Sequence, residues 1–282
     1  METNINRVAT LKMDKNEQVQ SFTTGDGVRI AFTMDGDESK PVLVLSNSIA
    51  TNFHMWDEQV PVFAEYFRVL RFDTRGNGAS DAPGGDYSVD RMALDVIELL
   101  DSLHIGRVHF LGLSLGGYIG QWLGIHAPER IDRLILANTS SYLGPAKAWN
   151  DFIKSLRRHG DMEKFATMFM NNWFPGHMIS SNDSRVAAFR KMVLATTPQG
   201  LAGSYAAVRD ADMRKTIALI PNTTLVIAGK YDVVTVPAHG EEIAQTIPNA
   251  KLVILPAVHM SNIEYGKDFE KLVIDFLVGS QE

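Results

Sequence analysis

The chain has 282 residues and a net charge of −6, and 45% of its residues are hydrophobic. This composition is typical of a globular domain with a core large enough to fold without disulfides, and the absence of cysteine excludes disulfides and thiolate metal sites. The chain has no basic patch that would indicate nucleic-acid binding, and no apolar run near the roughly 18 residues of a membrane-spanning helix. We therefore expect neither a nucleic acid nor a membrane as a partner.

The first 20 residues are polar, carry charges of both signs and lack the apolar segment of a signal peptide. We interpret residues 1–20 as a flexible leader and expect a cytoplasmic protein. The absence of cysteine fits a reducing compartment, although secreted proteins can also lack cysteine.

Short β-rich runs alternate with longer helical runs in the first half of the chain, which is typical of α/β proteins with a mostly parallel, twisted sheet flanked by helices. Continuous apolar runs predict strands that are buried on both faces. The predicted strands are 18–23, 28–34, 41–46, 67–72, 108–111 and 133–138, and the predicted helices are 88–103 and 115–127.

The pattern changes after residue 140. Residues 141–215 have helical periodicity without a convincing strand, and they are rich in aromatic residues and methionine. We interpret this block as a helical cap inserted into a core formed by residues 21–140 and 216–282. The second part of the core is predicted to contain strands 223–228 and 251–255, a helix that ends at residue 247, and a closing helix over 266–278.

A G-x-S-x-G motif spans residues 112–116, between a predicted strand and a predicted helix. At such a sharp turn the central serine, Ser114, adopts strained backbone geometry and exposes its hydroxyl. Gly112 and Gly116 have no side chains, so the strand and the helix can approach closely there. The helix N-terminus also offers unpaired N–H groups to a developing negative charge. The sequence therefore predicts that Ser114 is a nucleophile.

A serine nucleophile needs a base, and the base needs an acid that orients it. Asp232 follows the predicted strand 223–228, and His259 follows the predicted strand 251–255. Both therefore lie at the carboxyl edge of the sheet, where Ser114 also lies. We predict a triad in which Ser114 attacks, His259 acts as the base and Asp232 orients His259.

Two backbone N–H groups are predicted to form the oxyanion hole, which stabilises the tetrahedral intermediate. One belongs to Leu115, directly after the nucleophile, and the other belongs to Ile49, in the loop after the predicted strand 41–46. The sequence lacks H-E-x-x-H spacing and a Gly-rich phosphate loop, so no motif indicates metal-dependent hydrolysis or a dinucleotide site, and we expect no metal.

Several stretches outside these sites carry a family resemblance. They are LSNS at 45–48, HMW at 54–56, RVLRFDTRG at 68–76, IGQWLG at 119–124, APER at 127–130, TPQG at 197–200, AVRDAD at 207–212 and SNIE at 261–264. With them, the chain from about residue 28 to residue 277 resembles the α/β-hydrolases, and more narrowly the 3-oxoadipate enol-lactone hydrolases. The resemblance implies hydrolysis of a small lactone by the triad, without a cofactor.

The position after the strand-end segment 138–141 departs from these relatives. They tend to carry arginine or lysine there, and a cation would suit the free carboxylate of an oxoadipate lactone. Tyr142 occupies this position and supplies no charge. Arg209 and Lys147 are candidate substitutes for the cation.

Tyr142 and three aromatic residues of the predicted cap are candidates for the substrate pocket. They are Tyr142, Trp149, Trp173 and Phe174. Three hypotheses follow: an enol-lactonase, a carboxylesterase or lactonase for a neutral and more hydrophobic substrate, and a non-catalytic ligand-binding protein on the same fold. In each, the expected partner is a small molecule, and nothing in the sequence indicates an oligomeric state.

Overall fold

An eight-stranded, mostly parallel sheet forms the centre of the molecule. The structure, a computed structural model, describes residues 19–279, and its strands lie in the order β1-β2-β4-β3-β5-β6-β7-β8. β1 pairs antiparallel with β2 and β2 with β4, whereas the other neighbouring pairs are parallel. The strands are β1 (Gln20–Thr23), β2 (Arg29–Asp35), β3 (Val42–Ser46), β4 (Arg68–Phe72), β5 (Val108–Leu113), β6 (Ile131–Ala137), β7 (Thr223–Gly229) and β8 (Ala250–Leu255).

The predicted α/β class and mostly parallel sheet are confirmed, and each predicted strand has a counterpart within a few residues of its expected bounds. Residues 1–18 of the predicted leader lie outside the described residues, and β1 begins at Gln20.

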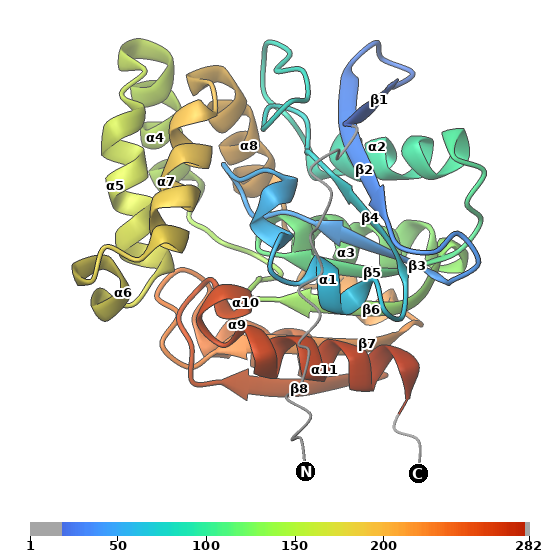
Figure 1. The fold of residues 1–282 in the computed structure, drawn as a ribbon. Helices are drawn as coiled ribbons and strands as arrows, with labels where there is room; N and C mark the ends of the chain where they lie inside the picture. The colour runs from blue at the N-terminus through green and yellow to red at the C-terminus, as the bar shows by residue number, and fades with distance from the viewer. Residues whose placement is uncertain (1–18, 280–282) are drawn as a thin grey trace, which may run out of the picture.

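Helices cover both faces of the sheet (Figure 1). On one face α1 contacts α11, and on the other face α2 contacts α3. The predicted helices 88–103 and 266–278 are both confirmed. The helices around the sheet are α1 (Val60–Phe63), α2 (Val89–Ser102), α3 (Leu115–His126), α9 (Pro237–Thr246), α10 (Ser261–Glu264) and α11 (Gly266–Val278).

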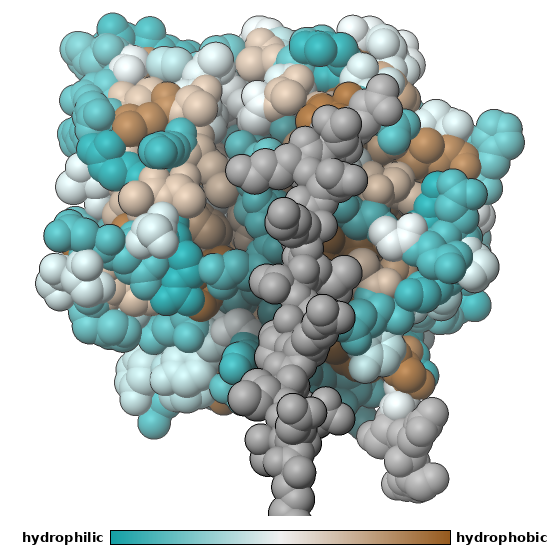
Figure 2. All heavy atoms as spheres, viewed as in Figure 1, coloured by the Kyte–Doolittle hydropathy of each residue, from teal (hydrophilic) through white to brown (hydrophobic). Residues whose placement is uncertain are grey.

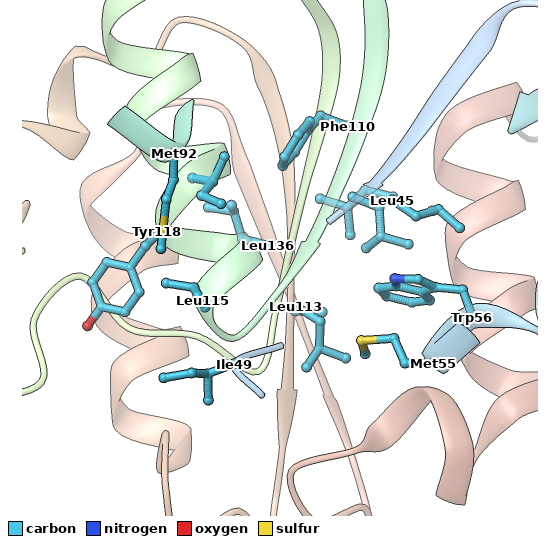
Figure 3. Packing of buried hydrophobic residues seen from close by; sticks show 14 of the residues in the cluster. Leu45, Ile49, Met55, Trp56, Met92, Phe110, Leu113, Leu115, Tyr118 and Leu136 are labelled. Carbon is cyan, nitrogen blue, oxygen red and sulfur yellow. The ribbon is translucent and has the colours of Figure 1, made fainter. Parts of the chain in front are cut away.

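The core has two layers because the central strands are buried on both faces. Every residue of β5 is buried, as the continuous apolar run predicts for a central parallel strand. Figure 3 shows Met92 and Tyr118 on one side of the strands, and Met55 and Trp56 on the other. These side chains keep helices on both faces in contact with the strand that leads to the site.

Five helices form a cap beside the carboxyl ends of the parallel strands (Figure 1). α4 packs against α8, and α5 packs against α7. All five lie within the predicted segment 141–215, and no strand of the sheet falls there among the described residues. The cap helices are α4 (Ala146–His159), α5 (Met162–Trp173), α6 (Gly176–Ser180), α7 (Ser184–Ala195) and α8 (Pro198–Asp210).

The face drawn in Figure 2 carries hydrophilic residues around its outline, and apolar side chains show between them over the cap. Within residues 19–279, no helix combines the length and the apolar character needed to cross a membrane.

The turn between β5 and α3 packs directly against the end of β3. A Cβ atom on Gly116 would lie 2.3 Å from the Ser46 carbonyl oxygen, and one on Gly112 would lie 2.0 Å from the Gly116 carbonyl oxygen. Real Cβ atoms do not approach this closely, so only glycine fits at either position. The two glycines of the motif therefore permit the close crossing that the sequence predicts.

Replacing Gly116 tests this crossing. We expect Gly116→Ala to lower the free energy of unfolding by about 3 kcal/mol, because the methyl group must displace the β3 backbone. Gly106→Ala is the matched control, since a Cβ there would meet no atom within 4 Å. Urea unfolding of both variants measures the difference, and equal losses in the two would contradict the prediction.

Candidate active site

Ser114 occupies the turn between β5 and α3 with a φ of 57° and a ψ of −112°. A positive φ is uncommon for a residue other than glycine and marks a strained position. The strain is held by backbone hydrogen bonds, from Ser114 N to the Ala137 carbonyl (2.9 Å) and from Gly117 N to the Ser114 carbonyl (2.9 Å). The first bond extends the pairing of β5 with β6, so the neighbouring strand supports the turn.

His259 and Asp232 form a buried pair at the ends of β8 and β7. His259 Nδ1 lies 2.8 Å from Asp232 Oδ2, and both side chains are almost completely inaccessible. Because the carboxylate accepts the Nδ1 proton, Nε2 is left as an acceptor. Nε2 is sealed from solvent and has no hydrogen-bond partner among the described residues, and His259 lines one cavity together with Ser114.

Asp232 accepts hydrogen bonds on both carboxylate oxygens. Oδ1 accepts from Val234 N (2.8 Å) and Thr235 N (3.0 Å), and Oδ2 accepts from Thr235 Oγ1 (2.8 Å) and Asn138 Nδ2 (3.1 Å). Burial acts to raise the pKa of Asp232, but attraction to the protonated form of His259 and the side-chain hydrogen bonds from His259, Asn138 and Thr235 outweigh it and hold the pKa below its ordinary value. The carboxylate therefore stays ionised beside the imidazole.

Ile49 and Leu115, whose N–H groups are the predicted oxyanion hole, lie on different segments beside the same cavity. Ile49 and Leu115 both line it with Ser114, and Figure 3 shows their side chains close together. Within residues 19–279 neither N–H donates a hydrogen bond, and no side chain caps the start of α3. The loop that carries Ile49 is tied to α3 by a bond from Gly116 N to the Asn47 carbonyl (3.0 Å). Both groups are therefore free to bind an oxyanion.

The cavity is apolar, and the cap provides most of its wall. Its lining contains no lysine, arginine, aspartate or glutamate among the described residues, and its polar groups from the cap are the Asn172 amide and the Tyr205 hydroxyl. The cap residues that line it are Leu143, Trp149, Phe152, Met168, Phe169, Asn172, Trp173, Tyr205 and Val208. Such a wall favours an uncharged group of the ligand over a charged one.

Of the four predicted pocket residues, Trp149 and Trp173 line the cavity. The Trp173 ring stacks on the imidazole of His259, with the two ring centroids 6.4 Å apart. Tyr142 and Phe174 do not belong to the lining, which corrects the expectation for these two residues. The Arg214 guanidinium instead lies over Tyr142, with Arg214 Cζ 4.0 Å from the centroid of the tyrosine ring. Phe174 packs edge-on against Phe189.

The two candidate substitutes for a substrate-binding cation are also elsewhere. Arg209 binds Asp210 and Asp86, and Lys147 is exposed and pairs with Asp151. Neither lines the cavity. The cation expected beside a substrate carboxylate therefore has no counterpart among the described residues of this lining.

The family model for the alpha/beta hydrolase fold matches residues 41–265. The chain belongs to the α/β-hydrolase family. It is 36% identical to "3-oxoadipate enol-lactonase 2" of Acinetobacter baylyi over 89% of this chain and 93% of that protein.

Two solved structures extend the comparison. A hydrolase from Pseudomonas aeruginosa has 52% identity and a TM-score of 0.91, covering 93% of this chain and 99% of that one. The enol-lactonase from Burkholderia xenovorans has 36% identity and a TM-score of 0.89, covering 92% of this chain and 100% of that one.

Sequence reasoning missed three side chains that bear on the site of this α/β-hydrolase. Asn138 and Thr235 bind Asp232, and Tyr205 lines the cavity. Asn138 directly follows β6, so its place at the carboxyl edge of the sheet was a usable signal. Nothing in the sequence pattern distinguished Tyr205 from the other aromatic residues of the cap.

Within the described part of the chain, no group of three acidic, histidine or cysteine side chains could hold a metal ion.

Asp73, after β4, anchors the loop that follows Ile49. Its carboxylate accepts hydrogen bonds from Phe53 N and Ala79 N, both at 2.7 Å. Asp73 therefore acts as a turn-building carboxylate at the end of β4. Burial raises its pKa to about 6, against the opposing effect of the two N–H donors.

The raised pKa of Asp73 gives a prediction for stability against pH. The folded carboxyl takes up a proton near pH 6 and the unfolded one near 3.8, so acidification from pH 7 to 4 favours the folded state at this position. We expect the unfolding free energy of wild type, minus that of Asp73→Asn, to rise over this range by on the order of 3 kcal/mol.

Asp37→Asn serves as the control of opposite sign. Hydrogen bonds from the Ser39 N–H and hydroxyl hold the pKa of Asp37 below its ordinary value, so the corresponding difference falls on acidification. Denaturant unfolding of the three proteins at several pH values measures both differences. A difference for Asp73→Asn that falls with acidification would show that burial does not dominate there.

Proposed function

We propose that this α/β-hydrolase cleaves a small carboxylic ester or lactone through an acyl-enzyme on Ser114. The observation that carries the proposal is the buried Asp232–His259 pair, because His259 has an unpartnered Nε2 and lines the same cavity as Ser114. The strained turn at Ser114 and the free N–H groups of Ile49 and Leu115 support the same reaction. A protein that only binds a ligand has no use for this combination.

In the proposed reaction, His259 Nε2 takes the hydroxyl proton while Ser114 Oγ attacks the carbonyl carbon. The resulting oxyanion is bound by the N–H groups of Ile49 and Leu115, and Asp232 stabilises the protonated imidazole. When the tetrahedral intermediate collapses, the bond between the carbonyl carbon and the leaving oxygen breaks, and His259 returns the proton to that oxygen. Water, activated by His259, then hydrolyses the acyl-enzyme and restores the Ser114 hydroxyl.

The relatives make 3-oxoadipate enol-lactone the first substrate to test. The relative from Acinetobacter baylyi and the solved structure from Burkholderia xenovorans both carry the name enol-lactonase. Each is 36% identical to this chain, over 89% and 92% of its length respectively. In a lactone the leaving oxygen remains tethered to the acyl group, so the reaction of the triad opens the ring and releases a single product.

A second candidate, an esterase or lactonase for neutral substrates, is favoured by the charge-free lining of the cavity. A substrate carboxylate placed against this wall would lose its hydration without gaining a cation, which is costly. Aromatic rings from Trp149, Phe152 and Trp173 supply apolar contact instead.

Removing the nucleophile tests the reaction common to both candidates. We expect Ser114→Ala to lower kcat by at least about a thousandfold, because the acyl-enzyme can no longer form. Enol-lactone loss followed by ultraviolet absorbance measures the rate, and Ser102→Ala, at the end of α2, is the control. Retained turnover in Ser114→Ala would refute the proposed nucleophile, and binding without turnover in wild type would favour the non-catalytic hypothesis.

A matched pair of substrates decides between the two candidates. We expect kcat/KM for the methyl ester of the enol-lactone, measured at the lactone ring, to exceed that of the free acid by at least about tenfold, because the ester carries no charge into the cavity. Rates with both substrates at equal ionic strength measure the ratio. Preference for the free acid would instead support an enol-lactonase that binds the carboxylate outside this apolar wall.

A further inference from the structure

Asn138 is a buried amide at the carboxyl end of β6. It is 1% exposed, and its backbone has a φ of 42°, in the left-handed region that asparagine tolerates better than most residues. Asn138 N donates to the Ile227 carbonyl on β7 at 2.8 Å. The residue therefore lies between β5, which leads to Ser114, and β7, which leads to Asp232.

The side chain of Asn138 connects the acid, the base loop and α10. Nδ2 donates to Asp232 Oδ2 (3.1 Å) and to the Val258 carbonyl (3.3 Å), and Oδ1 accepts from Ser261 Oγ (2.6 Å). Val258 directly precedes His259 in the chain. One amide thus touches the carboxylate that orients the imidazole and the backbone that carries it.

The chemistry of the partners allows only one orientation of this amide. A carboxylate and a carbonyl only accept hydrogen bonds, so the amide nitrogen must face Asp232 and Val258. The Ser261 hydroxyl can donate to the remaining oxygen, and Ser261 is fully buried. A flipped amide would place its oxygen against two acceptors, so the hydrogen bonds to Asp232 and Val258 would both be lost.

Other groups around the pair leave this role to Asn138 and Thr235. Asp232 Oδ2 has two side-chain donors besides His259, namely Thr235 Oγ1 and Asn138 Nδ2. The carboxylate of Glu264, at the end of α10, accepts a hydrogen bond from Val258 N at 2.7 Å. Thr235 Oγ1 also lies 3.4 Å from His259 Nδ1, whereas Asn138 contacts the backbone before His259 through the Val258 carbonyl.

We propose that Asn138 and Ser261 act as coupled positioning residues for the acid–base pair. Ser261 fixes the orientation of the Asn138 amide. Asn138, at the end of β6, in turn fixes the position of Asp232 Oδ2, after β7, relative to the backbone before His259, after β8. This inference rests on the proposed roles of His259 and Asp232 in hydrolysis. It adds that the geometry of the Asp232–His259 pair depends on Asn138 at the end of β6, as well as on the ends of β7 and β8.

The first variant is Asn138→Gly, which removes the amide and suits the positive φ. We expect kcat to fall about 10- to 100-fold with KM nearly unchanged, because a hydrogen bond to a charged group is lost. The negative charge left on Asp232 Oδ2 holds a protonated imidazole more tightly, so the acidic limb of the pH–rate profile moves to higher pH.

Asn222→Gly is the matched control. Asn222 is also buried and donates two amide bonds, to the Pro128 and Ile131 carbonyls at the opposite end of β6. It should lose stability without moving the pH profile. An unchanged rate and profile in Asn138→Gly, or an equal shift in Asn222→Gly, would overturn the inference.

Ser261→Ala tests the coupling, and it serves alone if Asn138→Gly does not fold. We expect a smaller loss of kcat with the same direction of shift, and no further loss when Ser261→Ala is added to Asn138→Gly. Additive losses in the double variant, or a wild-type rate and profile in Ser261→Ala, would overturn the coupled role.

A titration of the His259 ring protons by NMR, assigned by their absence in His259→Gln, provides a readout that needs no substrate. We expect the midpoint to rise in Asn138→Gly relative to wild type. This result separates the two proposals, because Ser114→Ala tests the reaction while the titration tests only the positioning of the pair. An unchanged midpoint would contradict the role assigned to Asn138.

Discussion

The close crossing of the β5–α3 turn over the end of β3 is the constraint on which the site depends. A side chain at Gly112 or Gly116 would collide with backbone at 2.0 to 2.3 Å, so these positions must lack one. The crossing brings Gly116 N to the Asn47 carbonyl, and thereby places the loop of Ile49 beside the helix N-terminus. The strained backbone of Ser114 and the paired free N–H groups are consequences of the same packing.

The parallel sheet then assembles the rest of the site from strand ends. Strands β5, β6, β7 and β8 are consecutive in the sheet, and each is followed by one residue of the proposed site: Ser114, Asn138, Asp232 and His259. Neighbouring strands lie about 4.8 Å apart, so residues that are distant in the chain come within hydrogen-bonding reach. Asn138 follows the strand between the nucleophile and the acid, and this place explains its contacts with both later loops.

The cap determines the chemistry of the cavity rather than that of the catalytic groups. Helices α4, α5 and α8 present aromatic rings and methionine toward Ser114, while Arg209 is held by Asp86 and Asp210 away from the lining. The reacting groups thus match a general ester or lactone hydrolase, and the wall opposite them excludes charge.

The sequence by itself determined the order of strands and helices, because apolar runs and glycine positions report burial and close approach locally. It also predicted that Ser114, Asp232 and His259 lie at one edge of the sheet, where the structure pairs His259 with Asp232 and places His259 and Ser114 in one cavity lining. The pocket was decided only by tertiary structure: Tyr142 packs under Arg214 and Phe174 against Phe189, while Trp149 and Trp173 line the cavity. Helical periodicity does not record which neighbour a side chain meets. The same holds for Asn138, whose partners lie about 100 residues away and are selected by strand adjacency and hydrogen-bond complementarity.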